Sequence, residues 1–206
     1  LQGSDQGDTL NGDALENTMY GGGGNGNDNL AGRGGDDGLF GINGNDTLEG
    51  GLDSDYLDGG EGADTASYRN ATEGVSIALT GAFIAEGEAV GDILISIERL
   101  LGSDFDDELR GDGAANTLTG VDGNDLLNGR GGNDVLYGGE GGDTLIGGGG
   151  NDFFDYKALN QGGDQISDFS PAAVGNNDTL RFAGNVFGGL SSGALDADRF
   201  VSNATG

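Results

Sequence analysis

A nine-residue repeat constrains the fold of this chain more than any other feature of its sequence. Residues 120–155 read GVDGNDLLN, GRGGNDVLY, GGEGGDTLI and GGGGNDFFD, with glycine at position 1, aspartate at position 6 and a large apolar residue at position 8. Alternation across the last three positions predicts a very short strand that points only its middle residue inward. The glycines before it permit the positive φ angles that a chain reversal needs. The period therefore predicts a stacked β-solenoid.

Two repeats make one flattened coil of 18 residues, with strands on two faces and turns along two edges. Successive coils pair as parallel strands about 4.8 Å apart, so the position-6 residues of repeats n and n+2 lie one above the other. Carboxylates about 5 Å apart repel by roughly 3 kcal/mol at an effective dielectric of about 20. Such a column is favourable only with cations between its members. Calcium suits the place because it takes about six to eight oxygen ligands, backbone carbonyls included.

The same register extends over thirteen repeats, and eleven of them carry aspartate at position 6. An ordinary turn-capping aspartate would not need this fixed phase, so the pattern favours metal binding. The repeats at Gly12 and Gly111 have Asn17 and Asn116 instead, and we expect weak or absent calcium sites there. The repeats begin at Gly3, Gly12, Gly23, Gly32, Gly41, Gly50 and Gly59, and at Gly102, Gly111, Gly120, Gly129, Gly138 and Gly147.

The GGxGxDxUx pattern, in which U is a large apolar residue, resembles the RTX (repeats-in-toxin, haemolysin-type) calcium-binding family. The resemblance implies several bound Ca²⁺ ions. It also implies that one turn supplies the carbonyls of positions 1 and 3, the next turn those of positions 2 and 4, and both the position-6 aspartate. The candidate metal ligands are Asp8, Gly23, Asn25, Asp28, Gly32, Gly34, Asp37, Gly41, Asn43, Gly44, Asp46, Gly50, Asp55, Gly59, Glu61, Asp64, Asp107, Gly120, Asp122, Asp125, Gly129, Gly131, Asp134, Gly138, Glu140, Asp143, Gly147, Gly149, Asp152 and Asp164.

The predicted fold is an all-β parallel β-roll in two repeat blocks, residues 1–67 and 102–155. Between them, residues 68–101 lose the period but contain VSIAL and DILISIERL, which read as strands, so we expect a strand-rich connector. Residues 156–206 resemble the C-terminal cap of serralysin-type proteins and are expected to form a β cap. A solenoid needs such a cap to cover its last apolar coil.

The composition fits folding that depends on a ligand. The chain has 47 glycines, no cysteine and a formal charge of −28, which favours disorder unless a metal neutralises the acids. This charge argues against nucleic acid as a partner, and no apolar run approaches the ~20 residues of a membrane helix. The absence of cysteine is compatible with an extracellular protein held together by metal. Because the chain starts inside a repeat, we expect it to be a segment of a longer protein.

Together with these observations, the resemblance implies a calcium-binding module of a secreted bacterial protein that folds on binding calcium outside the cell, and so supports export and stability of its parent. The resemblance implies type I secretion. The alternative is a structural or adhesive module of a surface-layer, adhesin or extracellular-matrix protein. Candidate partners are calcium, the rest of the parent polypeptide, neighbouring copies and a cell-surface component.

Catalysis is not expected from the chain itself. Residues 189–193 match the G-x-S-x-G elbow of serine hydrolases, but the chain has no histidine with which to build a Ser-His-acid triad. The parent protein remains open as a protease, lipase or epimerase of which this chain is the non-catalytic part.

Overall fold

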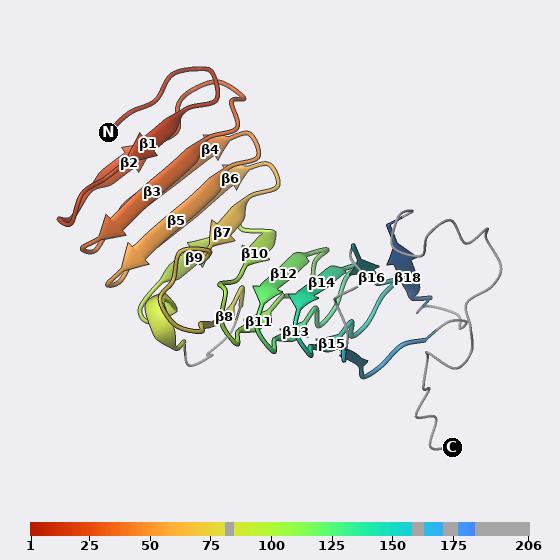
Figure 1. Cartoon of the computed structure of the whole chain (residues 1–206). Coiled ribbons are helices and arrows are strands. Elements are labelled where there is room, and N and C mark those ends of the chain that lie inside the picture. Colours follow the sequence, from red (N-terminus) through yellow and green to blue (C-terminus); the bar gives the residue numbers. More distant parts are fainter. Residues whose placement is uncertain (81–84, 158–162, 171–176, 184–206) are drawn as a thin grey trace.

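The structure, a computed structural model, describes residues 1–80, 85–157, 163–170 and 177–183. Over these residues the regular elements are all strands apart from one short 3-10 helix, η1 (Gly87–Ala89). From β1 to β18 the strands stack into a parallel β-roll (Figure 1), as the nine-residue period predicts. In the described part of the chain, no helix is long and apolar enough to cross a membrane.

Most strands are three or six residues long, because each repeat contributes one strand between two turns. The strands are β1 (Thr9–Asn11), β2 (Thr18–Tyr20), β3 (Asn29–Gly34), β4 (Gly38–Asn43), β5 (Thr47–Leu52), β6 (Tyr56–Glu61), β7 (Thr65–Ser67), β8 (Ser76–Ala78), β9 (Ile93–Ile95), β10 (Arg99–Leu101), β11 (Glu108–Arg110), β12 (Thr117–Asp122), β13 (Leu126–Asn128), β14 (Val135–Glu140), β15 (Thr144–Ile146), β16 (Phe153–Tyr156), β17 (Gln165–Ile166) and β18 (Thr179–Phe182).

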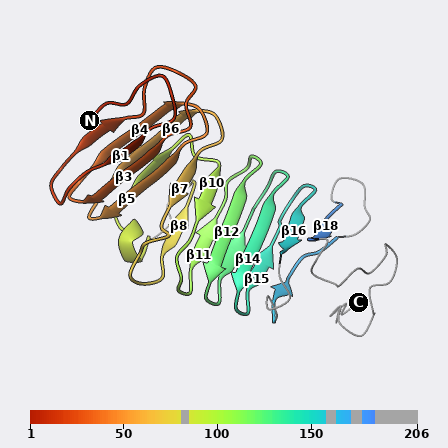
Figure 2. The same ribbon diagram turned by 45° about the horizontal axis from the view of Figure 1, so that its top comes forward.

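The two faces of the roll are built differently. One face is a single nine-stranded sheet in the order β1-β3-β5-β7-β10-β12-β14-β16-β18. The opposite face is divided into a four-stranded sheet, β2-β4-β6-β9, and a five-stranded sheet, β17-β15-β13-β11-β8. Figure 2 shows the coils of the second block following one another along the same axis. The long sheet therefore spans both repeat blocks, while the short sheets meet at the connector.

The connector supplies strands to all three sheets. After β7 the chain forms β8, which pairs with β11 of the second block. It then returns to form β9, which pairs with β6 of the first block. Finally β10 fills the long sheet between β7 and β12, with Leu100 facing Ala66 and Leu118. The break in the sequence period thus leaves the long sheet in register.

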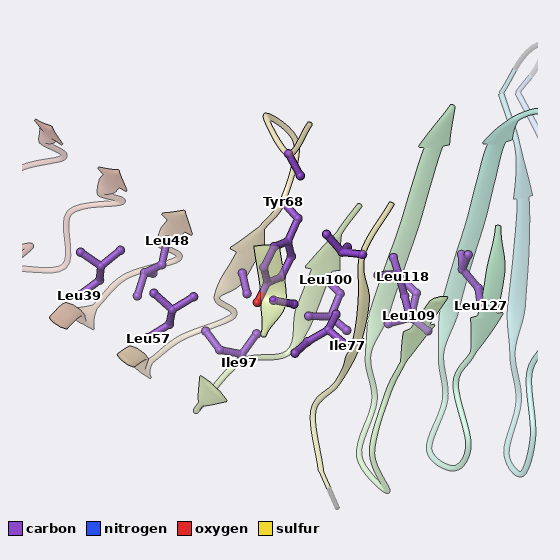
Figure 3. Close-up of a cluster of buried hydrophobic side chains, with 14 of the residues drawn as sticks. Leu39, Leu48, Leu57, Tyr68, Ile77, Ile97, Leu100, Leu109, Leu118 and Leu127 are labelled. Carbon is purple, nitrogen blue, oxygen red and sulfur yellow. The ribbon is translucent and has the colours of Figure 1, made fainter. Parts of the chain in front are cut away.

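The core is a double column of position-8 side chains. Leu30 and Leu48 face each other in adjacent strands and are fully buried, as are Leu39 and Leu57 on the opposite face. Figure 3 shows these columns continuing through Leu100, Leu109, Leu118 and Leu127. Each buried leucine contributes about 1.5–3 kcal/mol relative to exposure. Since only one residue in nine is a large inward-facing apolar side chain, this core is thin for the length of the chain.

At the C-terminal end, two further strands continue the roll without the repeat. Strand β17 pairs with β15 and β18 pairs with β16, both parallel. They follow Asp164 and Asp178, each two residues before an inward apolar side chain. The remaining residues of the expected cap, and the G-x-S-x-G match at 189–193, lie outside the described residues.

Candidate calcium-binding turns

Position-6 side chains form hydrogen-bonded columns along both edges of the roll. The backbone N–H of each donates to a carboxylate oxygen of the residue at the same place one coil further on, as from Asp107 to Asp125 Oδ1 and from Asp125 to Asp143 Oδ1. Fourteen such bonds span 2.7–3.1 Å. Acidic side chains therefore stack directly above one another, as the n and n+2 stacking predicts.

Each carboxylate uses only one oxygen in this ladder, and in eight turns the other oxygen has no partner. Asp125 and Asp134 are about 2% and 0% exposed, so their second oxygen is out of contact with water. Leaving a buried acceptor unpaired costs about 1–3 kcal/mol, and more for a charged group. The eight buried, unpaired oxygens are Oδ2 of Asp37, Asp46, Asp55, Asp64, Asp125, Asp134, Asp143 and Asp152.

The unpaired oxygens point at the position-1 glycines, next to backbone carbonyls. A Cβ atom built on Gly120 would overlap Asp125 Oδ2 and lie 2.6 Å from the carbonyl oxygen of Gly138. Gly129 has the same relation to Asp134 Oδ2 and, at 2.7 Å, to the carbonyl oxygen of Gly147. Only glycine fits here, because a side chain would fill the space in which carboxylate and carbonyl oxygens converge.

The backbone conformation at position 2 is the same in all eight turns. In each of them the position-2 residue has a positive φ, including 82° at Ile42 and 107° at Val121. A β-branched residue in this region is disfavoured by sterics, and such strain persists only where the surroundings impose it. We call these eight turns the open turns; they begin at Gly32, Gly41, Gly50, Gly59, Gly120, Gly129, Gly138 and Gly147.

Burial makes the open turns unfavourable for charge without a cation. It raises the pKa of Asp125 to about 8, with further contributions from the neighbouring carboxylates Asp107 and Asp143. Burial likewise raises the pKa of Asp55 and of Asp134 to about 7. A divalent cation bound between successive turns would remove this penalty and supply the missing partner of each Oδ2.

Calcium fits the donor set that the turns provide. Among the described residues, no three or more acidic side chains come together as a ready-made metal site, so a cation here depends on backbone carbonyls. The carbonyl oxygens of Glu61, Glu140 and Gly149 each accept one N–H from position 4 of the preceding coil. A carbonyl has two lone pairs, so this bond leaves one for a metal. Oxygen-only donors that include carbonyls are the ligands calcium prefers.

Apart from Gly23 and Asp28, which belong to the widened turn described below, the predicted ligands separate into three groups in the structure. The position-1 glycines and position-6 aspartates of the open turns converge as expected. At positions 3 and 4 of the repeats as read from the sequence, the side chains of Asn25, Glu61, Asp122 and Glu140 are exposed, so these positions could contribute only carbonyls. The same two positions are occupied by Gly34, Asn43, Gly44, Gly131 and Gly149. The third group is Asp8, Asp107 and Asp164, whose carboxylates have hydrogen-bond partners outside the ladder, Ser4, Ser103 and Tyr156.

One repeat begins two residues earlier than the sequence suggests. Gly21, not Gly23, lies at position 1: a Cβ on it would overlap Asp28 Oδ2 and lie 2.6 Å from the Gly41 carbonyl oxygen. Gly21 N–H also donates to the Phe40 carbonyl, the bond that Gly12 makes to Ala31. The two extra residues therefore widen the turn after its first position, and placing the repeat start at Gly23 was wrong.

Besides the predicted Asp164, three acidic residues outside the repeats complete the columns. Asp92 accepts the N–H of Asp55, Glu98 that of Asp64, and Asp178 that of Asp152. Each stands two residues before an inward apolar side chain: Leu94, Leu100 and Leu180. This acid-x-apolar spacing was the available signal for all three.

A second ladder involves the residue just before position 6. There the direction is reversed: the side chain accepts an N–H from the following coil, as Asn133 Oδ1 does from Asn151 at 2.8 Å. Asn45 and Asn124 each accept in the same way. The recurring Asn-Asp pair in the sequence was its signal. Two opposed ladders per edge fix the turns in register.

The fold and these turns define a parallel β-roll whose edges are lined with oxygen ligands for a hard cation. The family model of the RTX calcium-binding nonapeptide repeat (4 copies) matches residues 39–66, 96–127 and 119–154. All eight open-turn aspartates except Asp37 lie inside these stretches. The matched stretches are therefore RTX calcium-binding repeats, and they fold as a parallel β-roll. No curated protein was found to match it.

Proposed function

We propose that this chain is the calcium-binding module of a secreted bacterial protein, and that it folds on binding calcium outside the cell. The observation that carries the proposal is the set of eight buried Oδ2 atoms without partners, each beside a position-1 glycine. Without a cation these atoms oppose folding, and with one they support it. Metal binding and folding are then a single equilibrium.

The thin core makes the metal decisive. With one inward apolar residue per repeat and a formal charge of −28, the calcium-free chain has little to offset its conformational entropy. A site filled to ten times its dissociation constant adds about 1.4 kcal/mol. Several such sites together add an amount comparable with the usual margin of about 5–15 kcal/mol for a whole domain. Extracellular calcium modules bind at about 10⁻⁴–10⁻³ M, so calcium outside the cell would suffice.

This switch accounts for a role in export and stability of a parent protein. In low calcium the acidic chain stays extended and can be exported; in high calcium it folds and cannot return. RTX repeats are generally non-catalytic, and we infer a binding and folding role for the chain, with calcium and the rest of the parent polypeptide as partners. A structural or adhesive role at a cell surface remains the alternative.

The test is circular dichroism of the chain in chelator and in calcium. We expect a largely disordered spectrum in chelator and a cooperative gain of β structure with calcium. Magnesium at the same concentration should substitute poorly, because it demands octahedral geometry at about 2.1 Å and gives up water reluctantly. A folded spectrum in chelator, or equal folding with both metals, would contradict the proposal.

A further inference from the structure

Four turns differ from the open turns, because their position-6 side chain is already satisfied. In each, the backbone N–H of position 2 donates to a position-6 oxygen of the same turn, over 2.6–2.8 Å. The four bonds join Ser4 to Asp8, Asp13 to Asn17, Ser103 to Asp107 and Asp112 to Asn116. We call these the closed turns.

A second bond stabilises each closed turn. The position-2 side chain accepts the N–H of position 4, as Ser103 Oγ does from Phe105 at 3.1 Å and Asp112 Oδ1 from Ala114 at 2.7 Å. Ser4 and Asp13 make the same bond. This is the local side-chain turn that serine and aspartate favour. Position 2 is therefore a polar residue with a local hydrogen bond in the closed turns, whereas in the open turns it is a residue with a positive φ.

The backbone conformation follows the same division. Position 2 has positive φ in all eight open turns, whereas none of the four closed-turn residues is among the described non-glycine residues with positive φ. In a closed turn the peptide after position 1 presents its N–H to the position-6 oxygen. A protein donor thus takes the role that a cation would have in an open turn.

Closed turns occupy the same place in each block. Two of them form the first coil of the first block, residues 3–20, and the other two form the first coil of the second block, residues 102–119. Both coils share the pattern GSDxxDxLxGDxxxNT. The second of these coils, residues 102–119, is termed the junction coil here.

The junction coil packs against the connector on its N-terminal side. Its strand β11 pairs with β8, and Thr117 to Thr119 pair with β10. Val75 N–H donates to Asp107 Oδ1 at 2.8 Å. Figure 3 shows Leu109 and Leu118 next to Ile77 and Leu100, and all four are buried.

The connector also satisfies its own half-buried acid, Asp92. The hydroxyl of Tyr68, itself 3% exposed, donates to Asp92 Oδ2 at 2.9 Å, while Oδ1 of Asp92 accepts the Asp55 N–H. Both carboxylate oxygens of Asp92 and of Asp107 therefore have protein partners. In the described part of the connector and junction coil, no buried carboxylate oxygen lacks one.

We propose that the junction coil, together with the connector strands β8 and β10, is a calcium-independent nucleus on which the calcium-dependent coils of the second block assemble. The inference rests on the proposed calcium-driven folding of the open turns. Residues 3–20 have the same turns but stack only on coils of the first block, which need calcium. That first coil therefore becomes ordered with its block.

Hydrogen exchange of the full chain, resolved to short peptides, tests this nucleus. In chelator we expect amides of residues 102–119 to exchange at least tenfold more slowly than those of residues 120–154. In calcium both stretches should be protected. Protection of residues 120–154 in chelator would instead contradict calcium-driven folding itself, so the two failures are distinguishable.

Matched variants show whether the closed turn is the cause. Ser103→Ala removes the Oγ bonds to Asp107 and Phe105 and should reduce protection of residues 102–119 in chelator at least tenfold, with protection in calcium retained. Ser4→Ala removes the equivalent bonds of residues 3–20 and should leave residues 102–119 unchanged. The proposal is overturned if residues 102–119 exchange freely in unmodified chain in chelator, or if both variants behave alike.

Discussion

Val121 illustrates, at the scale of one residue, what the open turn imposes. Its φ of 107° lies in a region that costs a non-glycine residue about 1–3 kcal/mol. The same position is glycine in the repeats at Gly138 and Gly147. The turn therefore needs this conformation whichever residue is present.

Val121→Gly should stabilise the calcium-bound chain by about 1 kcal/mol, because strain relief exceeds the added entropy of glycine in the unfolded chain. Denaturant unfolding in saturating calcium measures the change. Asp122→Gly is the control: its φ is not positive, so only the entropic cost remains and stability should fall. Equal losses from both variants would show that Val121 is not strained.

The residues found from sequence are those whose chemistry repeats at fixed spacing. Position 6 and position 8 could be predicted because one needs an acid and the other a buried apolar group in every turn. Gly21 could not be chosen as the repeat start, since the run from Gly21 to Gly24 offers four chemically identical candidates. The closed turns were missed because they differ from the open turns in the direction of the peptide N–H of position 2. The only sequence signal for this difference is Ser or Asp at position 2.

Along one edge of the roll, the position-6 residues of a column are joined by hydrogen bonds but do not all use their side-chain oxygens in the same way. Asp134 accepts the Asn116 N–H at 2.8 Å and keeps a buried Oδ2 for metal. Asn116, one coil earlier on the same edge, uses its oxygen to accept the Asp112 N–H. The two residues are neighbours in one column, but only Asp134 has a buried oxygen that is left for a metal ion.

Asp134→Ala should therefore lower both the number of bound calcium ions and the stability of the second block. Asn116→Ala leaves the Asp112 N–H without a partner, which costs about 1–3 kcal/mol, but should leave the calcium count unchanged. Calorimetric titration counts ions, and unfolding in saturating calcium measures stability. Loss of the same number of ions from both variants would mean that the position-6 carboxylate does not control binding.

The connector shows where the period stops being informative. Its strands could be recognised from apolar alternation, but their partners could not, since β8 and β9 join different short sheets although β8 comes first in the chain. That crossing follows from tertiary packing around Tyr68, Ile77 and Ile97. Asp92 and Glu98 enter the columns only once those strands are placed.

At the scale of the whole molecule, raised pKa values couple folding to pH. In the folded, calcium-free chain burial raises the pKa of Asp125 to about 8 and of Asp46 and Asp143 to about 6, against about 3.9 when unfolded. The folded state then holds protons that the unfolded state has lost. These groups stabilise the calcium-free roll most fully below about pH 4, and this contribution is lost as the pH rises through about 6 to 8.

In chelator, β structure should therefore increase as the pH is lowered from 8 to 5, without any metal. Circular dichroism across this range provides the measurement. Saturating calcium at pH 8 is the control, because the carboxylates are then ionised and paired with metal. A calcium-free β content that is constant, or that rises with pH, would contradict the buried state of the open-turn aspartates.

The unequal faces of the roll have a consequence for how such a protein can change in length. A duplication of 18 residues inside a block adds one whole coil and returns every downstream strand to its own sheet. A duplication of a single nine-residue unit would exchange the faces of all that follows, so that strands of the unbroken sheet would have to continue a divided one. Around the connector, where β8 and β9 end separate sheets, that exchange has no matching partners. Gain or loss of two repeats at a time therefore preserves the order of strands in each sheet, whereas gain or loss of an odd number of repeats does not.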